Sequence, residues 1–297
     1  MRPACRHRLR DLRSKANCRS KPSCKNHLFH AQNIATFDLP ELQPYRTLRR
    51  QFDHREQGLF VAEGEKVVRR LLESRLEVVS VLLPENWLVE LEPLLRARPE
   101  DVAVFVAQKR LLERLTGFSM YQGLLAVGRV PPPLSLEAML GRSARPRLLA
   151  TVDGLSSAEN IGALVRNCAA FGVQALLVGE TSASPFLRRA VRSSMGAIFH
   201  LPVLETTSLA NTLAQLRAQG VRSIAAHPHA QDRPLSRTDF SGDCCLVFGS
   251  EGRGLSPAVL AACQEAAAIP MPPSVDSLNV ASAAAVFLYE ANRQRMG

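Results

Sequence analysis

Hydrophobic residues in this chain occur either in short continuous runs or at every third or fourth position. The continuous runs predict buried strands, and the three-to-four spacing predicts amphipathic helices. In the first half, strands are expected at 58–62, 76–83, 102–106 and 124–130. Helices are expected between them, at 66–73, 87–98 and 111–115. Strands that alternate with helices indicate a small α/β domain.

The second half repeats the pattern with longer apolar runs. Strands are expected at 148–153, 175–179, 201–204, 223–226, 245–249 and 267–270. A helix is expected at 161–171, and an apolar helix at the C-terminus. Runs of this kind suit strands buried on both faces, and therefore a mainly parallel sheet flanked by helices.

Three consecutive prolines, followed by Gly141 and Pro146, indicate a linker between the two halves. The sequence thus divides into an extension at 1–44, a small domain at 45–130, the linker at 131–146 and a larger domain at 147–297. Structure is expected to begin near Tyr45.

Composition narrows the class of protein. Hydrophobic residues make up 46% of the chain and charged residues 22%, which supports a sizeable core and argues against wholesale disorder. No apolar run approaches the length of a bilayer span, so no membrane partner is expected. The N-terminus lacks the apolar segment of a secretory signal. We therefore expect a cytoplasmic, reducing environment in which the seven cysteines are thiols.

Positive charge is concentrated at the N-terminus. Residues 1–50 hold twelve Lys and Arg but three acidic residues, so they carry nearly all of the net charge of +10. We interpret residues 1–44 as a basic, mobile extension suited to a polyanionic partner. A solvated leader or an organelle transit peptide would have the same composition. No metal site is expected there, because the spacing is irregular in Cys5, Cys18, Cys24, His27 and His30.

The first motif with chemical potential spans residues 153–167. A strand ends at Asp153, a polar loop follows, and a helix is expected to begin near Asn160. Arg166 lies off the apolar stripe of this helix, on the same side as Gly162. Because Gly162 has no side chain, we expect a ligand to approach the helix in front of the guanidinium. An Asn cap followed by a surface Arg would give the same pattern.

The second motif, at 246–257, is an apolar strand that leads into a loop with three glycines and Glu251. Such a loop lets backbone N–H groups approach a ligand closely. Its glycine spacing matches neither the dinucleotide-binding fingerprint nor the P-loop. The alternative is a tight turn in which Ser256 and Pro257 begin a helix. Upstream, His227 and His229 follow a strand end, where they are either loop residues or ligand contacts.

The third motif, at 269–282, passes from a strand through a proline-stiffened loop to Ser277 and Asn279, which open the C-terminal helix. A helix N-terminus of this kind can bind an anion or polarise an alcohol, although ordinary capping explains it equally well. Arg188, Arg189 and Arg192 suggest phosphate contacts, or else a solvated helix face.

Together, and in this order, the motifs resemble those of the SpoU family of RNA ribose 2′-O-methyltransferases, in the SPOUT superfamily. The family's Asn and Arg, six positions apart, match Asn160 and Arg166, and its glycine loop matches residues 250–255. Its third motif matches residues 269–282, except that Ala281 separates Val280 from Ser282. The resemblance covers 147–297, and residues 45–130 are similar to an L30e-like RNA-binding domain.

The resemblance implies a fold that periodicity alone does not predict. The larger domain would be an α/β domain with a mainly parallel sheet and a C-terminal trefoil knot, a rare form of threading. The smaller, L30e-like α/β domain would bind the RNA substrate, a tRNA or rRNA. Two chains would pair as a homodimer through the knotted region. S-adenosylmethionine would be the cofactor, held largely by backbone at Gly249, Gly254, Ile269, Ser277 and Leu278.

The family's chemistry assigns the activation of the ribose hydroxyl to Arg166. A guanidinium stays protonated and is a poor base, so it would stabilise a developing alkoxide or act with an RNA phosphate. Orientation of the reacting groups would fall to Asn160, Glu251, Ser277 and Asn279. A non-catalytic RNA-binding protein and a base methyltransferase on a related knotted fold remain alternatives. The sequence does not identify the RNA or the nucleotide.

Overall fold

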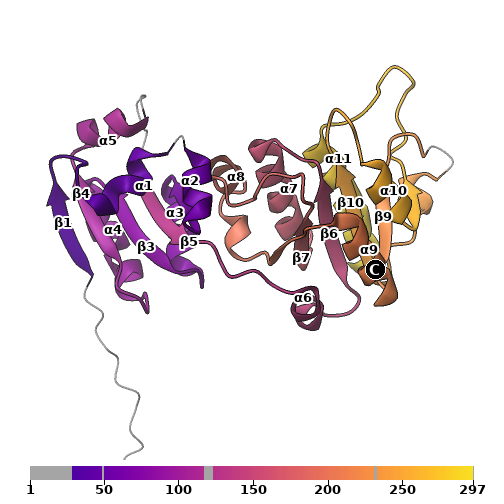
Figure 1. Cartoon of the computed structure of the whole chain (residues 1–297), viewed down its shortest axis with the longest axis horizontal. Helices are drawn as coiled ribbons and strands as arrows, with labels where there is room; N and C mark the ends of the chain where they lie inside the picture. Colours follow the sequence, from indigo (N-terminus) through magenta and orange to yellow (C-terminus); the bar gives the residue numbers. More distant parts are fainter. Residues whose placement is uncertain (1–28, 49, 117–122, 231–232, 297) are drawn as a thin grey trace, which may run out of the picture.

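The computed structural model describes residues 29–296 apart from 49, 117–122 and 231–232. The chain forms two α/β units that lie side by side, each built on its own sheet (Figure 1). This confirms the fold class expected from the sequence. Most of the basic extension lies outside the described residues, as do Cys5, Cys18, Cys24 and His27.

The N-terminal unit contains a five-stranded mixed sheet in the order β1-β4-β3-β5-β2. Its strands are β1 (His30–Ile34), β2 (Leu59–Glu63), β3 (Val78–Leu83), β4 (Ala103–Ala107) and β5 (Leu125–Arg129). Its helices are α1 (Gln43–Arg46), α2 (Gln51–Glu56), α3 (Glu65–Glu73), α4 (Glu85–Arg96) and α5 (Lys109–Thr116), with a 3₁₀ turn at Pro40–Leu42. β5 is antiparallel to both β2 and β3.

The structure begins earlier than the sequence predicted. β1 lies inside the segment interpreted as a mobile extension, where it pairs in parallel with β4 at the edge of the sheet. Four of its five residues are exposed, and only Ile34 is buried. The expected start near Tyr45 is therefore wrong. An exposed edge strand is held mainly by backbone hydrogen bonds, so it leaves no hydrophobic pattern to detect.

The linker also contains an unexpected helix, α6 (Leu136–Arg142). Ser135 caps its N-terminus by accepting a hydrogen bond from the Ala138 amide at 3.1 Å. Met139 and Leu140 are buried in a core cluster on one face of the C-terminal sheet. The linker is thus irregular at both ends, at 131–135 and 143–146, and the helix between them adds Met139 and Leu140 to the core of the larger unit.

The C-terminal unit contains a six-stranded sheet whose paired strands are all parallel, in the order β11-β9-β10-β6-β7-β8. Its strands are β6 (Leu148–Asp153), β7 (Ala175–Val178), β8 (Val203–Glu205), β9 (Arg222–Ala226), β10 (Cys244–Gly249) and β11 (Glu265–Ala267). Its helices are α7 (Ala158–Ala170), α8 (Arg188–Ser193), α9 (Leu209–Ala218), α10 (Pro257–Ala262) and α11 (Val280–Met296), with 3₁₀ turns at Ala197–Phe199 and Leu235–Arg237.

Most expected strands of this unit are confirmed, but the last lies at Glu265–Ala267 rather than at 267–270. β6 and β10 are central, and their residues are almost entirely buried, as the continuous apolar runs predict. Asp153 and Gly249 pair at the ends of these strands, so the first two motifs leave the sheet together. The trefoil knot remains a prediction. In the described part of the chain, every helix is too short or too polar to cross a bilayer.

Candidate active site

The glycine loop after β10 is a tightly closed turn. Ser250 and Gly254 exchange two backbone hydrogen bonds of 2.9 Å each. A Cβ on Gly249 would lie 2.3 Å from the carbonyl carbon of Gly254, and Gly254 itself has a φ of +64°. Both positions therefore require glycine. The buried carboxylate of Asp153 accepts a hydrogen bond from the Ser256 amide at 2.7 Å, which ties the loop to the end of β6.

Beside this loop lies a pocket of about 470 Å³. Its walls come from the loop after β9, the glycine loop, residues 269–278 and the first turns of α11. Its apolar lining includes Phe248, Leu255, Ile269, Leu278, Val280 and Phe287, and its polar lining includes Ser250, Glu251, Asp276, Ser277, His227 and His229. A pocket of this size with a few polar groups suits a small organic ligand. All five residues expected to contact a cofactor line it.

Asn279 connects the three motifs. Its side-chain amide nitrogen donates hydrogen bonds to Oδ1 of Asn160 at 3.1 Å and to Oε1 of Glu251 at 2.6 Å. Its side-chain oxygen accepts from the backbone amides of Ala281 and Ser282, which caps α11. The structure thus brings Asn160, Glu251 and Asn279 together at the rim of the pocket, although they are far apart in the sequence.

Asn160 is available for this contact because it does not cap its own helix. α7 begins at Ala158, and Ser157 is its N-cap, accepting from the Asn160 amide at 3.3 Å. The expected helix start near Asn160 is therefore late by two residues. Further along α7, the side chain of Asn167 donates to the Ala281 carbonyl at 2.7 Å, which fixes α7 against α11.

Gly162 has a different role from the one expected. A Cβ at this position would lie 1.9 Å from Oγ of Ser193 and 2.3 Å from the Ala190 carbonyl oxygen. α8 therefore occupies the space in which a ligand was expected to approach. Gly162 allows two helices to pack closely, and the predicted ligand path in front of the guanidinium is wrong.

Arg166 is exposed on α7 and makes no hydrogen bond or ion pair with any residue that the structure describes. It is also absent from the lining of the pocket. A single chain thus assembles Asn160, Glu251 and Asn279, and places Ser277 in the pocket wall, but it does not bring Arg166 to them.

The arginines of α8 are largely engaged within the protein. Arg188 and Arg192 donate to the two carboxylate oxygens of Glu63 at 2.8 and 3.0 Å. Arg189 is paired more loosely with Glu159 at 3.3 Å and stays exposed. Arg188 is largely buried in its ion pair with Glu63, so it is not available for the suggested contact with an RNA phosphate.

The four cysteines of the larger unit are buried or half-buried. Burial, together with the nearby carboxylate of Asp153, raises the pKa of Cys263 to about 12. Burial also raises the pKa of Cys244 and of Cys245, both in the core as expected. Among the described residues, no group of three or more His, Cys, Asp and Glu side chains is arranged to hold a metal ion.

Sequence reasoning missed two features of this site. The carboxylate of Asp153 was treated only as the end of a strand, whereas it holds the first residues of α10. Asp276 and Met271, in the loop before α11, also line the pocket. A buried acid at the carboxyl end of a central parallel strand was the available signal for Asp153, because that edge of a sheet is where ligands bind.

Comparison with known proteins agrees with this arrangement. Residues 147–289 match the model of the SpoU rRNA Methylase family. A protein of Mycobacterium tuberculosis named as an uncharacterized tRNA/rRNA methyltransferase is 34% identical over 276 residues, which cover 88% of this chain and 92% of that protein. The 23S rRNA (guanosine-2′-O-)-methyltransferase RlmB of Acinetobacter baylyi is 33% identical over 205 residues, 68% of this chain and 82% of the relative.

Solved structures show the same architecture. The SpoU methyltransferase AviRb of Streptomyces viridochromogenes, in complex with the cofactor AdoMet, superposes with a TM-score of 0.74 at 26% identity, over 87% of this chain and 99% of that one. The likeness extends over both units rather than over the larger one alone. With the glycine loop, the Asn279 bridge and these similarities in agreement, the chain belongs to the SpoU methylase family.

Proposed function

We propose that this protein transfers a methyl group from S-adenosylmethionine to a ribose 2′-hydroxyl of tRNA or rRNA. The observation that carries the proposal is the pocket beside the glycine loop, at whose rim Asn279 joins Asn160 to Glu251. The 2′-O specificity is that of the relative RlmB, and the cofactor is the one bound by AviRb. A cytoplasmic location belongs to the same proposal.

The residues of the pocket fit the cofactor. A side chain at Gly249 would collide with the backbone of Gly254, and the φ of +64° at Gly254 disfavours a side chain there, so backbone groups line the pocket at both positions. Ile269 and Leu278 would supply apolar walls for an adenine ring, and Ser277 and Glu251 would supply polar contacts for the charged methionine end. When bound, S-adenosylmethionine supplies a methyl group on a positively charged sulfur, which is a good leaving group.

The chain's own residues then have to position and activate the ribose. Asn160, Glu251 and Asn279 form one hydrogen-bonded set, which holds their polar groups in fixed orientations beside the pocket. Arg166, whose guanidinium has no partner among the described residues, would stabilise negative charge developing on the ribose oxygen. A guanidinium is a poor base, so the hydroxyl proton would pass to an RNA phosphate or to water.

We infer that a homodimer completes this site, because Arg166 does not reach the pocket within one chain. α11 exposes three large apolar side chains, Val286, Tyr289 and Met296, and the first two lie one turn apart on the same face. Tyr289 packs edge-on against Phe171 at the end of α7, at 6.3 Å between ring centroids. A second copy that covers this α7–α11 face would bury these side chains and place Arg166 at the interface.

Binding of the cofactor to purified protein tests the proposal. Calorimetry with S-adenosylmethionine should show saturable binding without added metal. Gly249→Ala should abolish the binding, because the new Cβ would collide with the backbone of Gly254. If the folded wild-type protein binds no cofactor, the chain is an RNA-binding protein without this activity. Methyl groups found on bases rather than riboses would support the base methyltransferase instead.

A further inference from the structure

Glu63 is a buried carboxylate at the boundary between the two units. It is the last residue of β2, and its side chain is 7% exposed. Both of its oxygens accept hydrogen bonds from α8 of the other unit, from Arg188 at 2.8 Å and from Arg192 at 3.0 Å. A buried charge is costly unless it is paired, so Glu63 and α8 are strongly constrained to stay together.

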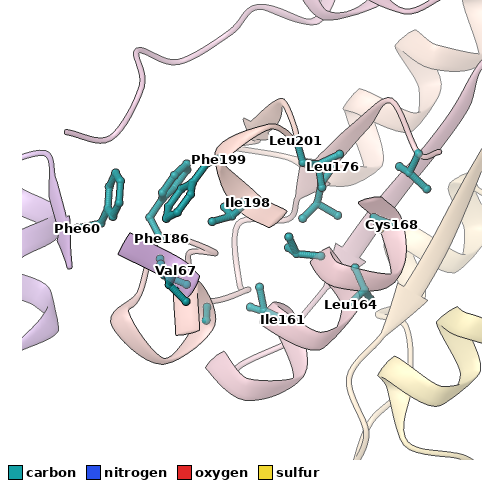
Figure 2. Packing of buried hydrophobic residues seen from close by; sticks show 14 of the residues in the cluster. Phe60, Val67, Ile161, Leu164, Cys168, Leu176, Phe186, Ile198, Phe199 and Leu201 are labelled. Atoms are coloured by element: carbon teal, nitrogen blue, oxygen red, sulfur yellow. The ribbon is translucent and has the colours of Figure 1, made fainter. Parts of the chain in front are cut away.

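Apolar packing supports the same contact. Phe60 of β2 lies 5.5 Å, between ring centroids, from both Phe186 and Phe199 of the larger unit. Figure 2 shows Phe60 and Val67 facing Phe186 and Phe199, with the buried side chains continuing to Ile161 and Leu164 of α7. The core therefore runs across the boundary without interruption, which is unusual for two domains joined by a simple tether.

α8 connects this boundary to the candidate site. One side of α8 holds Glu63, and its other side packs so closely on α7 that Gly162 has no room for a Cβ. On α7, Asn160 lies two residues before Gly162 and Arg166 four residues after it. α8 is thus one direct connection, beside the shared apolar core, between the N-terminal unit and the proposed catalytic residues on α7 (Figure 1).

We propose that Glu63 is a positioning residue: through Arg188 and Arg192 it locks the N-terminal unit to α8 and α7, so that RNA held by that unit presents one particular ribose to the active site. The inference rests on the proposed function. It differs from a tethered RNA-binding module, which raises the local concentration of RNA but does not select the nucleotide.

The two arrangements have different kinetic signatures. Loss of a tethered module weakens RNA binding, and saturating RNA restores the rate. Loss of a rigid lock leaves RNA binding intact but misplaces the ribose, and displacement by about 1 Å can cost about 100-fold in rate. Loss of the lock should therefore change kcat and the choice of nucleotide, and it should leave the KM for RNA unchanged.

Glu63→Gln tests the lock because it preserves the shape of the side chain and removes its charge. The substrate is total tRNA and rRNA purified from a strain that lacks the gene. We expect kcat at saturating RNA to fall at least tenfold and methylation to spread to neighbouring riboses. The KM for RNA and the Kd for S-adenosylmethionine should stay within twofold of wild type. Calorimetric unfolding should change from one transition toward two as the units separate.

Glu77→Gln is the matched control, because Glu77 forms an exposed ion pair with Arg129 inside the N-terminal unit and should change none of these quantities. If Glu63→Gln does not fold, Arg192→Gln replaces it. The Arg192 side chain is 60% exposed, and Arg188 would still pair with the buried carboxylate of Glu63, so a smaller loss of kcat and a broadened methylation pattern are expected.

A variant with separated unfolding transitions but normal kcat and a single methylated ribose would overturn the positioning role. So would a defect confined to the KM for RNA. The proposed function is tested separately by the wild-type protein in the same assay: without methyl transfer by wild type, the proposed function fails, whereas an active wild type with unaffected variants sinks only the positioning role.

Discussion

Asn279 is the residue on which the candidate site is built, because its amide serves two purposes at once. Its oxygen caps α11, and its nitrogen bridges Asn160 and Glu251. Capping alone explains a polar residue at a helix start, and the sequence motif left that explanation open. The bridge to Glu251, at 2.6 Å, is what separates the site from an ordinary helix terminus.

Asn279→Asp separates these two purposes. Aspartate caps helices as well as asparagine does, so the thermal stability should change little. The new carboxylate, however, would face Glu251 and could not donate to Asn160, so the bridge would become a repulsion. We expect methyl transfer to fall about tenfold or more with the melting temperature nearly unchanged. A variant with full activity would show that Asn279 is only a cap.

Arg166→Ala tests the catalytic assignment. Because Arg166 is exposed and unpaired among the described residues, its removal should leave folding and cofactor binding unchanged. Loss of a group that stabilises developing charge typically costs about 10²–10³ in rate, so most methyl transfer should disappear. Arg166→Lys keeps the charge but not the planar fork, and it should also be badly impaired. Near-normal single-turnover rates in Arg166→Ala would move the assignment to Ser277 or Glu251.

At the scale of elements, the sequence predicted the strands that consist of continuous apolar runs. It missed one strand that is held by backbone pairing and one short helix within the linker. The apolar runs predicted β6 and β10 as strands buried on both faces, and the structure places both at the centre of the sheet. Their parallel arrangement explains why the first two motifs meet at one edge. β1 was missed because backbone pairing at a sheet edge needs no apolar residues. α6 was missed because its glycine and the prolines on either side of it resemble a linker, although Met139 and Leu140 are buried.

The sequence predicted the part of the site that consists of polar residues in the loops after strands. The resemblance to a family assigned roles to Asn160, Glu251 and Asn279, and the structure shows that they touch. The ionic lock at Glu63 was not predictable, because a glutamate that ends a strand usually faces solvent. The close contact between Gly162 and α8 could not be predicted either. A glycine in a helix indicates that another group packs closely against it, but not whether that group is a ligand or a second helix.

Gly162→Ala tests the packing of α7 on α8. The new Cβ would lie 1.9 Å from Ser193 Oγ and 2.3 Å from a backbone carbonyl, so the helices must move apart. Overpacking of this kind costs about 1–3 kcal/mol of unfolding free energy. Gly141→Ala is the control: Gly141 lies in α6 with nothing within 4 Å, and alanine there should stabilise by about 0.4–1 kcal/mol. Equal effects in denaturant unfolding would contradict this account of Gly162.

At the scale of the whole molecule, the exposed apolar face of α11 is the feature that a second copy would explain. Val286→Lys should place a charge in the proposed interface and shift the protein from dimer to monomer in sedimentation experiments. Methyl transfer should fall with dimer content, because Arg166 would lose access to the pocket. Val89→Lys, at an exposed position of α4, should do neither. A fully active monomeric Val286→Lys protein would contradict completion of the site by a partner.

The most direct test of the central claim is the position of the methyl group that the protein transfers. Purified wild-type protein, incubated with S-adenosylmethionine and with tRNA and rRNA from a strain that lacks the gene, should add a methyl group to the 2′-oxygen of a defined ribose. The same ribose should be methylated in cells that carry the gene and unmethylated in cells that lack it. Methylation of a base, or an unchanged 2′-O-methylation map in both comparisons, would contradict the account.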